Sequence, residues 1–321
     1  MKFGVIGYGS IGKRHVQNLI SLGQDDIVLL REIGSGNQHG FSEVKNMTEL
    51  MSRNPDAVIL ANPTSMHASY LAKILAQDLH LLAEKPLVSS DSDLEMLEKS
   101  LSSYHGVGMT AYNMRFHPCV LEAQRIISEK MLGSIFSARF FVGQYLPSWR
   151  PHEDYSQSYS AKISMGGGVL FDLIHEIDLA CFLVGKPEGQ INAMAEKISD
   201  LKINSEDLAE ILYQTSEKSM VSIHLDYLTQ GYKRYIEIVG SQANLYADLY
   251  TNQVLVTSSE GVIHSQSYPE FSKNDMYVNM LKDFIDGTID GTIDGGLVEP
   301  SLKTGIISNQ IAIEIRKRLL L

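Results

Sequence analysis

Hydrophobic and polar positions divide the chain into two parts with different patterns. Up to about residue 112, short and almost wholly apolar runs alternate with amphipathic stretches. Such alternation predicts a parallel sheet with helices on both faces. The expected strands are Lys2–Ile6, Ile27–Arg31, Ala57–Ala61, His80–Ala83 and Val107–Ala111. The expected helices are Ile11–Leu22, Thr48–Arg53, Met66–Gln77 and Asp91–Ser103, the last with Asp91 or Ser92 as its N-cap.

After a connecting helix at Pro118–Met131, the pattern changes to longer stretches in which polar and apolar residues alternate. This period of two is typical of antiparallel or mixed sheets with one solvated face. The expected strands are Ile135–Tyr145, Ile191–Ile198, Ala209–Gln214, Met220–Leu228, Tyr235–Val239, Leu245–Leu249 and Gln253–Thr257. Helices are expected at Gly166–Gly185, Asp275–Asp286 and Leu302–Leu320, and a loop is expected at the Gly-Thr-Ile-Asp tandem, 287–294.

The fold class that these patterns predict is α/β with two domains. Residues 1–118 would form a Rossmann domain with a doubly wound parallel sheet. Residues 119–321 would form an α+β domain with a large, mostly antiparallel open sheet, and the C-terminal helix 302–320 would pack back toward the first domain. A length of 321 residues is enough for two such cores. An open sheet of this size exposes one face, which a homodimer or homotetramer would cover.

The composition and charge of the chain limit the classes of partner and location that we expect. The formal charge of −11 opposes binding to a polyanion, so no nucleic acid partner is expected. The basic cluster Arg316-Lys317-Arg318 closes a helix, where cations complement the helix dipole. No apolar run reaches the ~18 residues that span a bilayer, and no signal peptide is evident, so a cytoplasmic location is expected. Cys119 and Cys181 are expected to be reduced, packed thiols.

A glycine motif follows the first expected strand directly. Gly7-Tyr8-Gly9-Ser10-Ile11-Gly12 separates that strand from the first helix, which is the arrangement that binds a dinucleotide pyrophosphate. Gly7 would allow the tight turn, Gly9 the approach of the phosphates, and Gly12 close packing of the helix. The cofactor residues predicted here are therefore Gly7, Gly9, Ser10, Ile11 and Gly12.

The residues at the end of the second strand would bind the adenosine ribose of the cofactor. Glu32 could bind a ribose diol and favour NAD, whereas Arg31 could bind a 2′-phosphate and favour NADP. Cofactor choice stays open between NAD and NADP, with a slight preference for NAD.

Two further segments follow strands at the edge where an open α/β sheet binds ligands. Asn62-Pro63-Thr64, with His67, is either a cofactor contact or a proline turn in which Thr64 or Ser65 caps a helix. Glu84-Lys85-Pro86 is either a surface turn or a site where Lys85 presents a cation to a substrate hydroxyl. The X-Pro bond of this segment can be cis.

In the second part, Gly166-Gly167-Gly168 opens a segment that contains Asp172, His175, Glu176 and Asp178. On one helix, positions 172, 175 and 176 would share a face, so a carboxylate and an imidazole would project together as an acid and base pair. The triple glycine would allow the backbone to approach a ligand. Asp178 would orient His175 or support domain packing. No metal site is expected, because no second spaced histidine is present.

Together these motifs resemble the glucose-fructose oxidoreductase, inositol dehydrogenase and MocA family. The resemblance covers essentially the whole chain and includes Tyr112-Asn113-Met114-Arg115-Phe116. It implies hydride transfer between a sugar or polyol hydroxyl and NAD or NADP. It also implies that Lys85 is the catalytic lysine and that His175 is the general acid and base, with Asp172 beside it. Many family members have four residues from this aspartate to the histidine, whereas here the step is three.

The segment Tyr145–Pro151, with Asp154-Tyr155, resembles a subgroup associated with surface polysaccharides and sugar nucleotides. Trp149 and Arg150 suit a sugar face and an anionic group, although a packed loop anchor explains them equally well. The predicted substrate residues are Lys85, Arg115, Trp149, Arg150, Tyr155, Asp172 and His175. Asn113 is a candidate at the nicotinamide end of the cofactor.

Two other functions are compatible with the sequence. A glycoside hydrolase or lyase could retain NAD and oxidise a sugar hydroxyl only transiently, so that no NADH accumulates. A non-catalytic protein that senses a dinucleotide could use the same cofactor site, but it would not need both Lys85 and His175.

Overall fold

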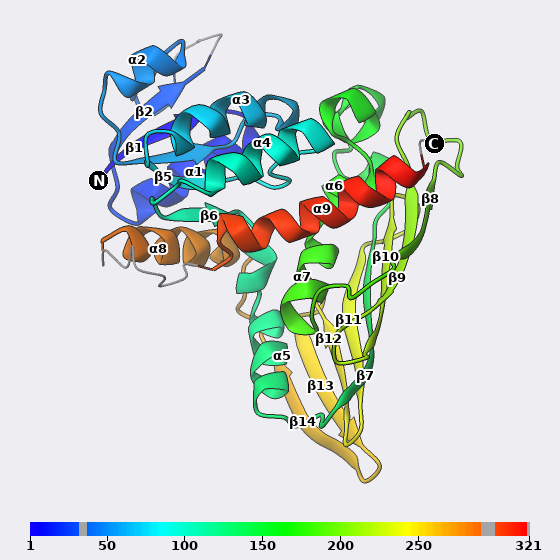
Figure 1. Cartoon of the computed structure of the whole chain (residues 1–321). Coiled ribbons are helices and arrows are strands. Elements are labelled where there is room, and N and C mark those ends of the chain that lie inside the picture. Colours follow the sequence, from blue (N-terminus) through cyan, green and yellow to red (C-terminus); the bar gives the residue numbers. More distant parts are fainter. Residues whose placement is uncertain (32–36, 290–298, 320–321) are drawn as a thin grey trace. The chain divides into compact units, whose positions relative to one another are not determined.

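The computed structural model describes residues 1–31, 37–289 and 299–319 of the chain. The chain forms two compact units (Figure 1). Unit 1 contains Met1–Asn113 and Asn274–Asn309, and unit 2 contains Met114–Lys273 and Gln310–Leu321. These units differ from the predicted division at residue 118, because the segment Asn274–Asn309 belongs to unit 1.

Unit 1 is built on a sheet whose described strands are all parallel, in the order β3-β2-β1-β4-β5-β6. Its strands are β1 (Lys2–Ile6), β2 (Asp26–Leu30), β3 (Ser42–Val44), β4 (Ala57–Leu60), β5 (His80–Ala83) and β6 (Gly108–Thr110). Most residues of β1, β2, β4 and β5 are buried, which explains their nearly unbroken apolar runs. The five predicted strands are confirmed, and β3 is an addition.

The helices of unit 1 are α1 (Ser10–Ser21), α2 (Met47–Met51), α3 (Thr64–Leu75), α4 (Asp91–Leu101) and α8 (Asp275–Ile289). Helices α3 and α4 lie side by side, and α1 packs against α8 (Figure 1). Ser90 is the N-cap of α4, so the predicted caps Asp91 and Ser92 are wrong by one or two positions. The first part of the predicted loop, 287–289, is the end of α8, and 290–294 lies outside the described residues.

Unit 2 contains an eight-stranded sheet in the order β14-β13-β12-β11-β7-β10-β9-β8. Neighbouring strands are antiparallel, except that β7 and β10 are parallel. The strands are β7 (Ile135–Gly143), β8 (Asn192–Glu196), β9 (Leu208–Gln214), β10 (Met220–Asp226), β11 (Lys233–Gly240), β12 (Asn244–Asp248), β13 (Gln253–Ser258) and β14 (Gly261–Ser267). The large, mostly antiparallel sheet is confirmed.

Helices α5 (Pro118–Ser128) and α7 (His175–Leu183) pack along one face of this sheet (Figure 1). Helix α9 (Leu302–Leu319) belongs to unit 1 as far as Asn309 and to unit 2 beyond it. The remaining helical segments are α6 (Val169–Asp172), η1 (Asn113–Phe116), η2 (Leu146–Ser148), η3 (Tyr155–Gln157), η4 (Tyr159–Ala161) and η5 (Ile163–Met165).

The opposite face of the large sheet, here called the exposed face, carries apolar and aromatic side chains. A row of rings crosses four strands: His224 stacks on Phe141 and Phe141 on Tyr235, and Tyr235 contacts Tyr246 at a tilt. Exposed apolar side chains of the same face are Met194, Leu212, Met220, Val239 and Tyr246. This face is therefore more apolar than the solvated face of a half-covered antiparallel sheet usually is.

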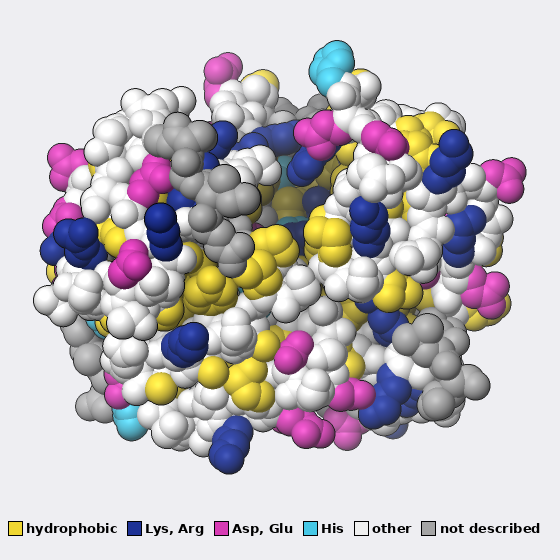
Figure 2. Space-filling model, turned by 90° about the horizontal axis from the view of Figure 1, so that it is seen from above, with side chains coloured by type: hydrophobic (Ala, Val, Ile, Leu, Met, Phe, Trp, Pro, Cys, Tyr) yellow, Lys and Arg dark blue, Asp and Glu magenta, His cyan; other side chains and the backbone are white. Residues whose placement is uncertain are grey.

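Charged side chains are distributed over the face of the molecule that Figure 2 shows. In the space-filling view of Figure 2, Lys and Arg side chains are interspersed with acidic and uncharged ones. Among the described residues no helix is both long and apolar enough to span a bilayer.

Candidate functional site

The glycine motif forms a tight turn between β1 and α1. Gly7 has a φ of +91°, and a Cβ on it would collide with the backbone of Ala61 and Asn62. A Cβ on Gly12 would collide with the carbonyl oxygen of Gly7, so α1 packs on the turn itself. At Gly9 a Cβ would have no neighbour within 4 Å. This open space beside the turn leaves room for a ligand.

The first turn of α1 also lacks a side-chain cap. Its N-cap is Gly9, which has no side chain that could accept a hydrogen bond from the first amides. Backbone N–H groups at a helix N-terminus favour an anion.

Asn62 follows β4 next to Gly7. Both polar atoms of its side-chain amide are buried, and neither has a hydrogen-bond partner among the described residues. An unpaired buried amide is costly unless a ligand satisfies it. His67 lies one turn into α3, where its ring nitrogens face the carbonyl oxygens of Asn62 and Leu87, at 2.9 and 3.1 Å. Burial lowers the pKa of His67, and a neutral imidazole has a single N–H, which donates to one of these two carbonyl oxygens.

The segment Glu84-Lys85-Pro86 follows β5, and its Lys85–Pro86 bond is cis. The Nε2 atom of His15, on α1, donates to Oε1 of Glu84 over 2.7 Å. The other carboxylate oxygen of Glu84 accepts from the backbone N–H of Lys85 at 3.3 Å. His15 was not among the residues predicted from the sequence, although it lies in the same helix as the glycine motif.

Other predicted cofactor residues are placed as follows. Pro63 is the N-cap of α3 and Thr64 its first residue, so the prediction of a Thr64 or Ser65 cap is wrong. Asn113 is buried at the start of η1. Arg31 directly follows β2, and its Nη1 atom lies 3.7 Å from Oε1 of Glu43. Glu32 lies outside the described residues.

In unit 2, Asp172 and His175 do not share one helix. Asp172 is the last residue of α6 and His175 is the first of α7, so the prediction of a single helix with both on one face is wrong. Tyr227, which directly follows β10, donates from its hydroxyl to Oδ2 of Asp172 over 2.7 Å. Burial and the nearby Asp172 carboxylate raise the pKa of Tyr227, which therefore remains a donor.

The other two acids of this segment form buried ion pairs. Glu176 receives two hydrogen bonds from Arg234, at 2.5 and 2.9 Å. Asp178 receives two from Arg115, at 2.8 and 2.6 Å. Asp178 thus orients Arg115. Arg115 is only 7% exposed, so its observed contact is structural.

The triple glycine is explained by contacts within unit 2. Gly168 has a φ of +104°, and a Cβ on it would collide with Glu206 and Arg316. Arg316 forms an ion pair with Glu206 and donates to the carbonyl oxygen of Gly167 over 2.7 Å. The predicted approach of the backbone to a ligand is therefore not needed to explain Gly168. Arg316 does more than complement a helix dipole.

A small pocket in unit 2 gathers several predicted substrate residues. Its volume is about 130 Å³. It is lined by Leu146, Trp149, Arg150, Glu153, Tyr155, Ser158, Tyr159, Ser160 and Asp172. Trp149 packs edge-on against Tyr227, with ring centroids 5.4 Å apart. Trp149, Arg150, Tyr155 and Asp172, chosen separately from the sequence, thus line one pocket that combines aromatic, hydroxyl and charged groups.

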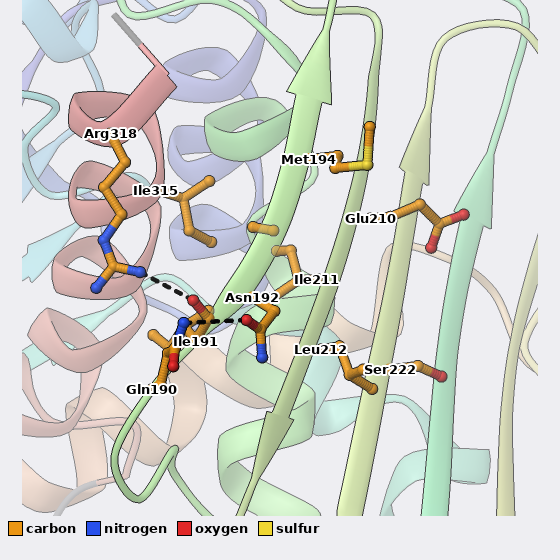
Figure 3. A pocket seen from close by; sticks show the side chains of 11 residues that line it. Gln190, Ile191, Asn192, Met194, Glu210, Ile211, Leu212, Ser222, Ile315 and Arg318 are labelled. Atoms are coloured by element: carbon orange, nitrogen blue, oxygen red, sulfur yellow. Dashed lines mark hydrogen bonds between the residues drawn. The ribbon is translucent and has the colours of Figure 1, made fainter. Parts of the chain in front are cut away.

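A larger groove of about 600 Å³ lies at β8 and β9 (Figure 3). Ile315 and Arg318 of α9 border it, and Arg318 donates to the carbonyl oxygen of Ile191 over 2.8 Å. None of the predicted site residues lines this groove.

The described residues fit a dinucleotide, although they hold no group of three His, Cys, Asp or Glu side chains arranged as around a metal ion. The uncapped N-terminus of α1, the open space at Gly9 and the unpaired amide of Asn62 all occur at one edge of the parallel sheet. Lys85 belongs to unit 1, whereas Asp172 and His175 belong to unit 2.

Family models match both the N-terminal and the C-terminal part of the chain. Residues 1–112 match the family model of the oxidoreductase family with an NAD-binding Rossmann fold, and residues 120–246 match that of the GFO/IDH/MocA C-terminal domain. The chain is 24% identical over 305 residues to myo-inositol 2-dehydrogenase of Thermotoga maritima, covering 89% of this chain and 87% of that protein.

Solved structures share the fold. A levoglucosan dehydrogenase in complex with NADH has a TM-score of 0.88 at 19% identity, covering 99% of this chain and 96% of that one. The WlbA dehydrogenase of Bordetella pertussis, in complex with NADH and UDP-GlcNAcA, has a TM-score of 0.79 at 20% identity, covering 100% and 96%. The two matching family models together span most of the chain, which therefore belongs to the Gfo/Idh/MocA family of oxidoreductases.

Proposed function

We propose that this enzyme transfers hydride between a secondary hydroxyl of a sugar, polyol or sugar nucleotide and a nicotinamide cofactor. The observation that carries the proposal is the pocket at Asp172, whose aromatic and polar lining suits a hydroxyl-rich ligand. The relatives agree in kind, since they include an inositol dehydrogenase and dehydrogenases bound to NADH.

Unit 1 would hold the cofactor. Gly9 and the first amides of α1 would face the pyrophosphate, and the unpaired amide of Asn62 would bind a polar group of the same ligand. When bound, the nicotinamide supplies the hydride acceptor or donor. We infer a preference for NAD, because Arg31, the residue suited to a 2′-phosphate, is engaged by Glu43 and lies over the ring of Tyr8.

Lys85 and His175 would be the catalytic pair. The imidazole of His175 would take the proton of the reacting hydroxyl during oxidation and return it during reduction. The ammonium group of Lys85 would stabilise the negative charge that develops on the same oxygen. Asp172, held by Tyr227, would orient the substrate or His175 from the end of α6.

Calorimetry with NAD, NADP and their reduced forms tests the cofactor step. Turnover is then tested with NAD and a panel that includes myo-inositol, levoglucosan and UDP-linked sugars. The proposal expects NADH in proportion to oxidised product, and it expects Lys85→Ala and His175→Ala to lose turnover while they still bind NADH. Turnover without NADH accumulation would identify the redox-neutral reaction instead. Absence of dinucleotide binding would refute the proposal.

We also infer that the exposed face of the large sheet joins copies of this chain into a homodimer or homotetramer. The row of rings and the exposed apolar side chains of that face support this inference.

A further inference from the structure

His15 forms a link inside unit 1 that the proposed mechanism does not use. It lies on α1, five residues after Ser10, and its side chain is fully buried. Its Nε2 atom donates to Oε1 of Glu84, and that carboxylate is itself only 12% exposed. A hydrogen bond to a buried carboxylate is among the stronger ones in proteins.

Glu84 connects this imidazole to the lysine of the proposed catalytic pair. Its second oxygen accepts from the backbone N–H of Lys85, and its own N–H donates to the carbonyl oxygen of Leu60. One carboxylate therefore joins the helix that begins at the glycine motif to the backbone of Lys85. These contacts all lie in unit 1.

The hydrogen bond to Glu84 is made through Nε2 of His15, and the other ring nitrogen makes none among the described residues. This nitrogen, Nδ1, is buried. The ring also packs edge-on against Tyr277, with centroids 6.2 Å apart. A leucine would fill this place without burying an unpaired nitrogen, so the hydrogen bond to Glu84 explains the histidine better than packing does.

We infer that His15 is a positioning residue: through Glu84 it holds the backbone of Lys85 at a fixed place relative to the first turn of α1. The inference rests on the proposed function of Lys85. In an enzyme of this kind, the cation must lie at the reacting oxygen to be effective, and small displacements reduce the rate strongly.

The test compares three variants in the full-length chain. His15→Leu removes the hydrogen bond to Glu84, His15→Gln replaces it with an amide N–H, and Asn18→Ala is the matched control. Asn18 is a buried residue of the same helix whose side-chain hydrogen bonds go to Asn274, at 2.9 and 3.2 Å. The control thus loses buried hydrogen bonds of α1 without touching Glu84.

Two measurements report on the position of Lys85: its chemical reactivity and the turnover of the enzyme. The first is acetylation of Lys85 by acetic anhydride, measured by mass spectrometry relative to the exposed Lys73. In His15→Leu the rate of this acetylation is expected to change about threefold or more, because the reactivity of a lysine amine depends on its burial and its neighbours. Turnover is expected to fall about tenfold to a hundredfold, as for loss of a hydrogen bond to a charged group. NADH affinity should stay within about threefold of the original value, since the pyrophosphate contacts remain.

His15→Gln should restore both readouts substantially, and Asn18→Ala should match the original protein in both. If His15→Leu resembles Asn18→Ala, with lower stability but unchanged Lys85 reactivity and turnover, the inference is overturned. Where the leucine variant does not fold, His15→Asn replaces it, because its shorter amide does not reach Glu84. Acetylation without NADH keeps the two hypotheses separate: it tests the link from His15 to Lys85 even if the protein binds no dinucleotide.

Discussion

Tyr227 donates its hydroxyl hydrogen to Asp172 over 2.7 Å, which joins the residue after β10 to the end of α6. The tyrosine is fully buried, and the edge of Trp149 packs against its ring. The hydrogen bond fixes the direction of the Asp172 carboxyl group. Asp172 is therefore held in place by the residue that directly follows β10.

Tyr227→Phe keeps the ring and removes only this hydrogen bond. We expect kcat/KM to fall about tenfold to a hundredfold, the usual effect of losing a hydrogen bond to a charged group, with unchanged NADH affinity. Steady-state kinetics and calorimetry measure both. Tyr213→Phe is the matched control, because Tyr213 is also buried and donates to the carbonyl oxygen of Gly185. Equal kinetics for the two variants would show that Asp172 does not depend on Tyr227.

Gly168→Ala should destabilise unit 2 more than an ordinary glycine substitution. Alanine would combine a positive φ with a Cβ that collides with the Glu206–Arg316 ion pair. We expect the free energy of unfolding to fall by about 2–5 kcal/mol, from backbone strain and overpacking together. Urea denaturation measures it.

Gly189→Ala isolates the backbone contribution to that loss. Gly189 also has a positive φ, of +79°, but a Cβ on it would have no neighbour within 4 Å. Its replacement should cost only about 1–2 kcal/mol. If both alanine variants lost the same stability, steric conflict with the ion pair would not be what requires glycine at position 168.

Much of the fold could be predicted because its signals are local. Buried parallel strands such as Ala57–Leu60 are continuous apolar runs, and the half-covered strands of unit 2 alternate. Strand β14 was missed because both of its faces are largely exposed, so its sequence, Gly261–Ser267, has no alternation to detect. Strand β3 was missed because it has only three residues, too few for a period.

The candidate site was predictable only where a motif marks it. The glycine turn and the residues around Asp172 are adjacent in sequence to recognisable patterns. The break between α6 and α7 has no glycine or proline to signal it, and it separates Asp172 from His175. Pairs such as His15–Glu84 and Arg316–Glu206 join residues 69 and 110 positions apart, and no local pattern encodes such partners.

His117 should make the stability of unit 2 depend on acid. Its Nδ1 atom accepts from the backbone N–H of Cys119 at the start of α5, which requires an unprotonated nitrogen. Burial, with a further contribution from Arg234, lowers the pKa of His117 to about 4 from 6.5. Because the folded pKa is the lower one, this contribution to stability is present above pH 6.5 and is lost as the pH falls toward about 4.

His117→Asn keeps a side-chain acceptor at the N-cap but does not titrate. The difference in unfolding free energy between the original protein and this variant should therefore shrink as the pH falls through that interval. Urea denaturation at a series of pH values measures the difference. A constant difference across the interval would contradict the assignment of the acid sensitivity to His117.

Tyr246→Lys should separate copies of the chain, if the exposed face of the large sheet joins them. Tyr246 ends the row of rings and is 42% exposed, so a lysine there would place a charge within the inferred interface without disturbing the core. Light scattering after size exclusion should give a multiple of 35.7 kDa for the original protein and a shift toward 35.7 kDa for the variant. Ile289→Lys provides the control, because Ile289 is an exposed apolar residue of α8 in unit 1 and its replacement should leave the mass unchanged. A mass of 35.7 kDa for the original protein would reject the inferred assembly, and equal effects of the two lysines would place the interface elsewhere.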